Sequence, residues 1–254
     1  MIIDISHHQC PKHMDYDRLS EQVDLAIIRT QYGSNLIDRY YQTHHREFQR
    51  RGVPTASYAW VRGISMHDME VEAKNYYSRT KEHNPAFYFL DVEERSMDDM
   101  RSGVHAYVNK LRELGAKKVG VYIGHQLYAS LNLKLDEVDA IWIPHYGKND
   151  GRANSKPHFQ CDIHQYTSLG RLDGYSGNLD FNRIISDKPL SYFTGILSKN
   201  DIRHSTSEWS GDAWKWAVDL GFLDGTRPKD PVTREELALV LRRVNFHISN
   251  NNQL

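Results

Sequence analysis

The chain has 254 residues and nearly equal numbers of basic and acidic residues (32 Lys and Arg, 33 Asp and Glu), so its formal net charge is −1 at pH 7. This balance gives no field for binding nucleic acid or an anionic membrane, and no apolar run approaches the roughly 18 residues that would span a bilayer. Hydrophobic residues make up 39% of the chain, which excludes global disorder and suits one large domain, or one medium domain with a small appendage.

Short β-rich segments recur at fairly even spacing and predict strands. They are Ile2–Ser6, Asp24–Tyr32, Val53–Val61, Ala86–Glu93, Lys118–Gly124, Asp139–Tyr146 and Cys161–Ser168, with a less regular pair at Arg171–Tyr175 and Leu179–Ile184. Helical patterns follow the first five strands. They are Tyr16–Gln22, Asp38–Arg51, Ser65–His83, Asp98–Leu114 and Gln126–Leu131.

This order predicts an α/β fold, a modified TIM-like barrel in which five β/α units are followed by three β-strands. Alternating strands and helices favour parallel pairing, and eight strands favour closure. An open, doubly wound sheet is the alternative. It is disfavoured because no Gly-rich phosphate loop follows the first strand.

The tail predicts a small two-helix module. Ser210–Gly221 has helical apolar spacing, and a second helix follows the turn at Asp224–Pro231. Thr233 and Glu236 have the spacing of a capping box at the start of that helix. Two short helices bury little surface, so we expect the module to need a partner, either the barrel or further copies of itself.

Cysteine and histidine usage argues against a metal centre. Cys10 and Cys161 are the two cysteines, and no export signal is visible at the start, so free thiols are expected. His7–His13 and His158–His164 mix His and Cys at short spacing, but the spacing fits no familiar zinc pattern well. We therefore expect exposed or hydrogen-bonded histidines and no metal or other cofactor.

The strongest chemical signal is a pair of carboxylates at the end of an apolar strand. Residues two apart share a face, so Asp91 and Glu93 point the same way as Phe87 and Phe89, toward the interior of a barrel. Acids there are costly unless the site uses them, and their mutual repulsion raises one pKa, as a general acid requires. The alternative is a strand that ends in solvent with exposed acids. Strand alternation turns Glu94 away.

Two further acids are expected at the same mouth. Asp4 lies late in the first strand and Asp180 in the last, and these strands are neighbours in a closed barrel. Several carboxylates with many aromatic residues suggest glycoside hydrolysis. Aromatic side chains in or near strand ends could line a saccharide groove, although each one taken alone is more often core or rim. They are Tyr32, Tyr58, Trp60, Tyr122, Tyr146 and Tyr166.

The segments DIS, IRTQYG, SYAW, FLDVE, VGVYIG, WIPHYG, HQYTS and LDFN occur in that order. Together they resemble the family 25 glycoside hydrolases, the lysozymes typified by the Chalaropsis enzyme and many phage endolysins, over residues 1–186. The resemblance implies the same barrel. It also implies hydrolysis of the β-1,4 bond between N-acetylmuramic acid and N-acetylglucosamine, with bacterial peptidoglycan as the partner.

The resemblance also implies roles for individual residues. The family's catalytic acid maps to Glu93, and Asp91 is its partner in the D-x-E pair. We favour Glu93 as proton donor and Asp91 as the group that positions the 2-acetamido group. A covalent intermediate or an activated water stays open. Asp4 and Asp180 would tune the charge and hold the sugar.

The expected substrate contacts extend the aromatic set. Tyr58, Trp142 and Tyr146 match aromatic positions of the family, and Gln165 lies in the HQYTS segment. SYAW replaces a common aromatic–His arrangement, which changes the nearby subsite.

The tail, residues 208–254 after a linker at 187–207, resembles a single S-layer homology motif. Such motifs usually occur in threes and bind secondary cell-wall polysaccharide. A single copy implies either a homo-oligomer that presents several copies or a docking helix pair. Trp214, Trp216 and Arg234 are the candidate wall contacts. The alternative is that the Trp residues pack the module's own core.

These patterns favour a phage-type endolysin, which would wait in the host cytoplasm, without a signal peptide, until a holin releases it to the cell wall. A non-catalytic wall-binding protein is an alternative, disfavoured because all four acids are present. A host autolysin exported by another route is the other alternative.

Overall fold

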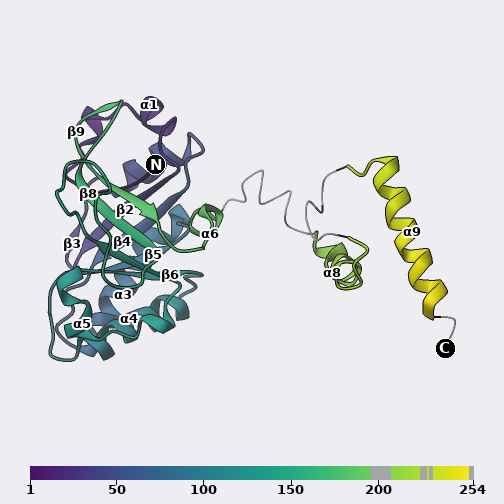
Figure 1. Cartoon of the computed structure of the whole chain (residues 1–254). Helices are drawn as coiled ribbons and strands as arrows, with labels where there is room; N and C mark the ends of the chain where they lie inside the picture. Colours follow the sequence, from purple (N-terminus) through teal and green to yellow (C-terminus); the bar gives the residue numbers. More distant parts are fainter. Residues whose placement is uncertain (196–206, 224–227, 229–230, 252–254) are drawn as a thin grey trace. The chain divides into compact units, whose positions relative to one another are not determined.

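The computed structural model describes residues 1–195, 207–223, 228 and 231–251. The chain divides into two compact units, Met1–Gly195 and Ile196–Leu254 (Figure 1). Most of the predicted linker at 187–207 and most of the predicted turn at Asp224–Pro231 lie outside the described residues. In the described part of the chain, no helix has both the length and the apolar composition needed to cross a membrane.

The first unit is a closed barrel of eight strands, as the sequence predicted. The strand β1 (Ile2–Ile5) pairs in parallel with β2 (Leu25–Tyr32) and antiparallel with β9 (Tyr175–Ile184), which closes the sheet and rules out the open alternative. Neighbouring barrel strands from β2 to β8, a series without β3, are parallel, whereas β8 and β9 are antiparallel. The barrel strands are β1 (Ile2–Ile5), β2 (Leu25–Tyr32), β4 (Thr55–Trp60), β5 (Tyr88–Val92), β6 (Val119–Ile123), β7 (Ala140–Pro144), β8 (Ile163–Leu172) and β9 (Tyr175–Ile184).

Helices follow the first five barrel strands, and α3, α4 and α5 lie together on one side of the sheet (Figure 1). The short strand β3 (Leu36–Ile37) pairs with the end of β2. The helices are α1 (Tyr16–Ser20), α2 (Tyr41–Gln49), α3 (Met66–Thr80), α4 (Met100–Glu113) and α5 (Tyr128–Leu131). The 3-10 turns of this unit are η1 (Pro11–His13), η2 (Lys81–His83), η3 (His125–Leu127) and η4 (Leu135–Glu137).

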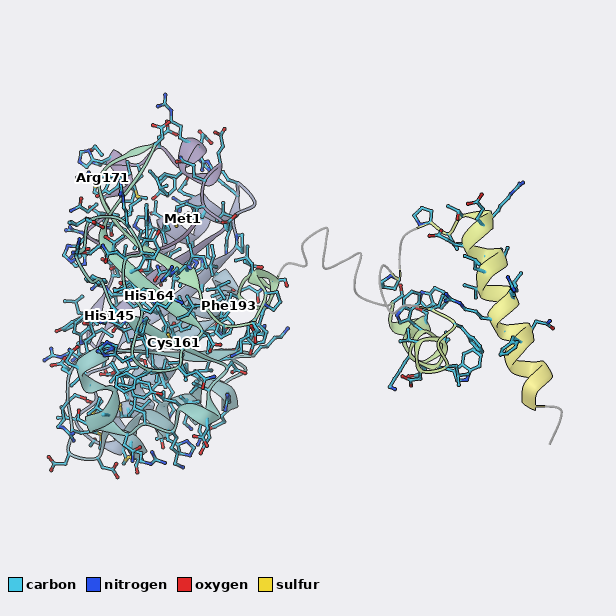
Figure 2. All side chains as sticks on the ribbon, in the orientation of Figure 1. Met1, His145, Cys161, His164, Arg171 and Phe193 are labelled. Carbon is cyan, nitrogen blue, oxygen red and sulfur yellow. The ribbon has the colours of Figure 1, made fainter. Side chains whose placement is uncertain are left out.

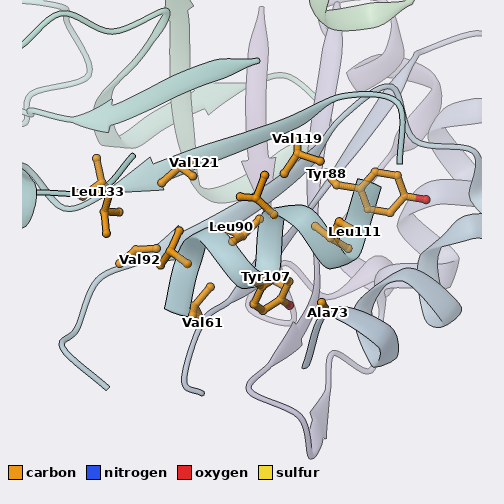
Figure 3. Close-up of a cluster of buried hydrophobic side chains, with 14 of the residues drawn as sticks. Val61, Ala73, Tyr88, Leu90, Val92, Tyr107, Leu111, Val119, Val121 and Leu133 are labelled. Carbon is orange, nitrogen blue, oxygen red and sulfur yellow. The ribbon is translucent and has the colours of Figure 1, made fainter. Parts of the chain in front are cut away.

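Residue alternation along β5 sets the two faces of the barrel wall. Leu90 and Val92 point outward into the core shared with α3 and α4 (Figure 3). Phe87 and Phe89 belong to the inner cluster, where their rings stack with centroids 5.0 Å apart. Because side chains alternate with a period of two, Asp91 continues the inner face toward the end of the strand.

The irregular pair of segments after the seventh strand forms a long hairpin. Arg171–Tyr175 is not a separate strand, because β8 runs on to Leu172 and the chain turns at Asp173 and Gly174. Gly174 has φ +96°, and a Cβ there would lie 2.7 Å from the Asp15 carbonyl oxygen. Only glycine fits this turn without strain.

The first unit ends later than the sequence predicted. The helix α6 (Leu190–Thr194) falls in the segment expected to be a linker, yet Phe193 is fully buried in the inner cluster (Figure 2). Its ring stacks on Phe87 with centroids 5.6 Å apart. The unit therefore runs to Gly195 rather than to residue 186, because α6 closes the end of the barrel core.

The described part of the second unit contains η5 (Glu208–Ser210), α8 (Gly211–Asp219) and α9 (Arg234–Asn251). The capping box before α9 is formed, since the amide of Glu236 donates to Thr233 Oγ1 at 3.2 Å and the amide of Thr233 donates to Glu236 Oε2 at 2.8 Å. Leu237, Leu239 and Leu241 on α9 are exposed within the structure. The unit thus leaves apolar side chains uncovered, as expected of two helices that bury little surface between them.

We predict that Phe193→Ala destabilises the isolated first unit, residues 1–195, by about 3–5 kcal/mol because it empties a fully buried site. Urea unfolding followed by ellipticity measures the change. Leu190→Ala is the matched control on the same helix. Leu190 is 39% exposed, so its loss should cost about 0.5 kcal/mol. Equal effects of the two substitutions would mean that α6 does not complete the core.

Candidate active site in the barrel

Four carboxyl groups meet inside the barrel at the carboxyl end of the parallel strands. Asp4 lies on β1, Asp91 on β5, Glu93 just after β5 and Asp180 on β9. Asp4 and Asp180 are directly paired across β1 and β9. The charges of Asp4 and Glu93 each raise the pKa of Asp180, and the charge of Asp4 raises the pKa of Glu93. The predicted convergence of these acids is therefore present in the structure.

Asp4 is the hydrogen-bonded centre of the group. Its Oδ2 accepts a hydrogen bond from Gln165 Nε2 at 2.9 Å and another from Asn182 Nδ2 at 2.8 Å. Burial raises the pKa of Asp4 to about 6, and these two bonds hold it below the value that burial alone would give. Asp4 is thus an anion at neutral pH whose orientation is fixed by two amides.

Asp91 and Glu93 are neighbouring acids that both have raised pKa values. Burial, and then the charge of Glu93, raise the pKa of Asp91 well above its ordinary value, and burial and then the charge of Asp4 raise the pKa of Glu93. Oδ1 of Asp91 is buried, and no hydrogen-bond donor from the described residues reaches it. The pair therefore keeps a proton at pH values at which an exposed acid would have lost it. Because the two groups interact, each titration step is a property of the pair and not of one residue.

Asp180 completes the group, beside Asp4 on the neighbouring strand β9. Burial raises its pKa to about 8, with the charges of Asp4 and Glu93 as the next causes. Such a site cannot hold four negative charges at once, because like charges in a buried space disfavour ionisation. At neutral pH the arrangement can supply both a proton donor and a carboxylate.

Aromatic and amide side chains fix Gln165 and Asn182, the two amides that contact Asp4. The hydroxyls of Tyr122 and Tyr146 donate to Gln165 Oε1 at 2.9 and 2.7 Å. Trp142 Nε1 donates to Asn182 Oδ1 at 2.8 Å. Each amide oxygen is thereby occupied, so each amide nitrogen points to Asp4. Trp142 is 1% exposed and forms the floor of the site rather than an open sugar platform.

The other predicted contacts divide between the mouth and the outer wall. Tyr58 belongs to the inner cluster, and its ring meets Trp142 edge-on. Tyr32 and Trp60 lie at the ends of β2 and β4 with ring centroids 5.0 Å apart. Tyr166 belongs to the outer cluster instead, because it is offset by one residue from the inward Gln165. The structure therefore does not place Tyr166 beside the four carboxyls of the site.

The sequence analysis did not single out two polar residues at the site, Arg29 and Asn182. Arg29 lies on β2 and is 7% exposed, and its Nε is 3.2 Å from Oδ2 of the buried Asp38. Its charge lowers the pKa of Asp91, against the effect of burial. Alternation from the inward Ile27 would have placed Arg29 on the inner face, and the same pattern from Asp180 would have placed Asn182 there.

Strand alternation had indicated that Glu94 points away from the mouth of the barrel. In the structure its side chain instead contacts residues at the mouth. Its Oε1 accepts hydrogen bonds from Trp60 Nε1 at 3.0 Å and from Arg62 Nε at 2.9 Å. The strand β5 ends at Val92, so the period of two no longer governs this residue.

The two segments rich in His and Cys do not form a shared site. The ring of His158, in the second segment, lies 4.9 Å from that of His125 and 5.2 Å from that of His145. Cys10 and Cys161 are both free thiols. Among the described residues, no group of three or more His, Cys, Asp or Glu side chains is arranged to hold a metal ion.

The candidate wall contacts lie in the second unit. Trp216 is 58% exposed, and its ring meets that of the buried Phe222 at 5.4 Å. Trp214 is half-buried, and Arg234 is exposed at the first turn of α9. Trp216 therefore both packs within the unit and presents a face to solvent. Trp209, which the sequence analysis did not single out, is 90% exposed.

A barrel that gathers carboxyls with raised pKa values beside aromatic side chains is the arrangement of a glycoside hydrolase, in which one acid protonates the leaving oxygen. Residues 3–175 match the glycosyl hydrolases family 25, and the chain belongs to this family.

Solved structures agree with this assignment. The chain is similar to GHIP, a glycosyl hydrolase 25 of Streptococcus pneumoniae, with 36% identity and a TM-score of 0.74 over 76% of this chain and 92% of GHIP. It is also similar to the catalytic domain of endolysin ply40 from bacteriophage P40 of Listeria monocytogenes, with 27% identity and a TM-score of 0.71 over 77% and 97% of the two chains. The CTP1L endolysin shares the fold over 98% of each chain, with 18% identity and a TM-score of 0.66.

We predict that Asn182→Ala raises the pKa of Asp4 above about 6, because the substitution removes a hydrogen bond that stabilises the carboxylate. Carbon-13 titration of the aspartate carboxyls measures the change. Asn109→Ala is the control, since this exposed asparagine of α4 pairs with His105 rather than with Asp4. An unchanged Asp4 titration in Asn182→Ala would contradict the role given to this hydrogen bond.

Proposed function

We propose that the protein is a peptidoglycan hydrolase that cleaves the β-1,4 bond between N-acetylmuramic acid and N-acetylglucosamine, with Glu93 as the general acid. The observation that carries this proposal is the pair formed by Glu93 and the buried Asp91, whose Oδ1 has no hydrogen-bond donor within the described residues. The family assignment supports the reaction class, and the likeness to the phage endolysin ply40 supports the substrate.

In the proposed reaction, Glu93 donates its proton to the glycosidic oxygen as the bond to C1 of the muramyl residue breaks. The carbonyl oxygen of that residue's 2-acetamido group attacks C1 and forms an oxazolinium intermediate. Asp91 accepts a hydrogen bond from the acetamido N–H, which satisfies its unpartnered oxygen. Water then attacks C1, and Glu93 takes back a proton.

Asp4 and Asp180 act through charge in this scheme. Asp4 is held as an anion by Gln165 and Asn182, and it raises the pKa of Glu93 so that the acid keeps its proton. Asp180 has a raised pKa beside the charge of Asp4, and in this proposal its carboxyl faces the bound sugar. Tyr58, Trp60, Tyr32 and Tyr146 form the aromatic surroundings of the sugar ring.

We predict that Glu93→Gln lowers kcat by about 10²- to 10⁴-fold, the usual contribution of a general acid. The measurement is mass spectrometry of fragments released from borohydride-reduced peptidoglycan, in which the wild type should create new reducing ends on N-acetylmuramic acid. Glu70→Gln, on the exposed face of α3, is the control and should cleave normally. Reducing ends on N-acetylglucosamine, or cut peptides, would refute the proposed bond.

The pH profile of the wild type tests the same pair. Activity should fall on the alkaline side as the Asp91–Glu93 pair loses its last proton, at a pH above that of an ordinary glutamate, because burial raises both pKa values.

The second unit is proposed to bind the cell wall, with secondary wall polysaccharide as its ligand and Trp214, Trp216 and Arg234 as contacts. The exposed Trp216 and the uncovered leucines of α9 support a binding role or association with further copies of the chain. An endolysin held in the host cytoplasm until holin-mediated release is the proposed biological setting.

We predict that deletion of residues 208–254 lowers binding to intact cells more than it lowers cleavage of soluble glycan. Pull-down with cell walls and a turnover assay on solubilised strands measure the two effects. Equal loss of both would indicate that the second unit supports the fold of the barrel instead of targeting it.

A further inference from the structure

We propose that Arg62, held at the mouth of the barrel by Glu94, is a specificity-determining residue that binds a carboxylate carried by the muramyl residues of the glycan. This inference rests on the proposed function, since it concerns the substrate of the same site.

Arg62 is placed at the rim by its main chain and its side chain together. It follows β4 two residues after the inward Trp60, and its backbone N–H donates to Oε2 of the buried Glu72 at 3.1 Å. Its guanidinium carbon lies 5.0 Å from the centroid of the Tyr32 ring. The positive charge is thus fixed over one of the two aromatic rings at the mouth.

The pairing of Arg62 with Glu94 leaves donors available. The contact uses Nε of Arg62 and Oε1 of Glu94 at 2.9 Å, and the side chains are 49% and 37% exposed. Within residues 1–195, neither terminal guanidinium nitrogen of Arg62 has a hydrogen-bond acceptor in the structure. An exposed pair of this kind is weak, so an incoming carboxylate can compete with Glu94. The free edge of a guanidinium matches a carboxylate, which it binds through two parallel hydrogen bonds.

The charges of the site explain why a cation at the rim is useful. Four carboxyls lie below the mouth, and those that are ionised, such as Asp4, repel an approaching anion. The buried Arg29 compensates these negative charges only in part, because its own charge is paired with that of Asp38, whose side chain is 0% exposed. Peptidoglycan carries carboxylates on the lactyl group of muramic acid or on its stem peptide. Arg62 offers these groups a half-exposed cation beside Trp60 and Tyr32.

The experiment measures KM and kcat for full-length wild type, Arg62→Gln and Glu94→Gln on three preparations of glycan strands. One carries stem peptides, one is stripped by an amidase so that the lactyl carboxylate is free, and one is stripped and then amidated so that no carboxylate remains. Arg112→Gln is the matched control. Arg112 forms an exposed ion pair with Asp139 at 3.1 Å, with 38% and 29% exposure, and lies on α4.

We expect Arg62→Gln to raise KM about tenfold on strands that carry a carboxylate, with little change in kcat, and to leave KM on amidated strands unchanged. Glu94→Gln keeps an acceptor for Trp60 but removes the competing charge, so KM on the anionic strands should stay constant or fall. A loss confined to the peptide-bearing strands identifies the stem peptide as the source. A loss confined to the stripped strands identifies the lactyl group, and a loss on both shows that either group is bound.

Two outcomes overturn the inference. If Arg62→Gln raises KM equally on anionic and amidated strands, the residue only supports the position of Trp60. If it changes KM no more than Arg112→Gln does, the pair is an ordinary surface contact. Failure of the proposed function is distinguished from both, because the wild type would then cleave none of the three preparations.

Discussion

The pairing of β1 with both β2 and β9 is the constraint on which the site depends. It closes the barrel, and it sets Asp4 directly beside Asp180 across the seam. Strands β8 and β9 then supply Gln165 and Asn182, whose amides fix Asp4. Without closure these groups would stand on opposite edges of a sheet, and Asp4 could neither be held as an anion nor raise the pKa of Glu93.

The buried carboxyls can take different chemical roles because their hydrogen-bonding surroundings differ. Asp4 receives two hydrogen bonds, whereas Oδ1 of Asp91 receives none from the described residues. Burial raises the pKa of all four carboxyls, but the bonds to Asp4 counter that effect at one of them. The site therefore keeps one anion and one shared proton close together. This separation of neighbouring carboxyls into acid and base roles is what acid-catalysed glycoside cleavage requires.

The two units contrast in how completely they bury their apolar surface. The barrel encloses inner and outer clusters and uses Phe193 of α6 to complete the inner one. The second unit has exposed leucines on α9 and a half-exposed Trp216. Tight packing suits a site that must hold carboxyls in place, and an uncovered face suits a unit whose role is to contact something else.

The sequence by itself determined the order of strands and helices, the closed barrel and the inward direction of Asp91, because periodicity and chain order are local properties. The capping box at Thr233 and Glu236 followed from spacing alone. Only the tertiary structure decided where loops and chain ends go. In the structure the barrel unit ends at Gly195, Glu94 contacts Trp60, and Tyr166 lies on the outer wall. The tertiary structure also revealed the network of Gln165 and Asn182 around Asp4. The end of the barrel, the direction of Glu94 and the hydrogen bonds to Asp4 depend on contacts between residues far apart in the chain, which no local pattern encodes. The outward direction of Tyr166 does follow from strand alternation once the direction of Gln165 is known.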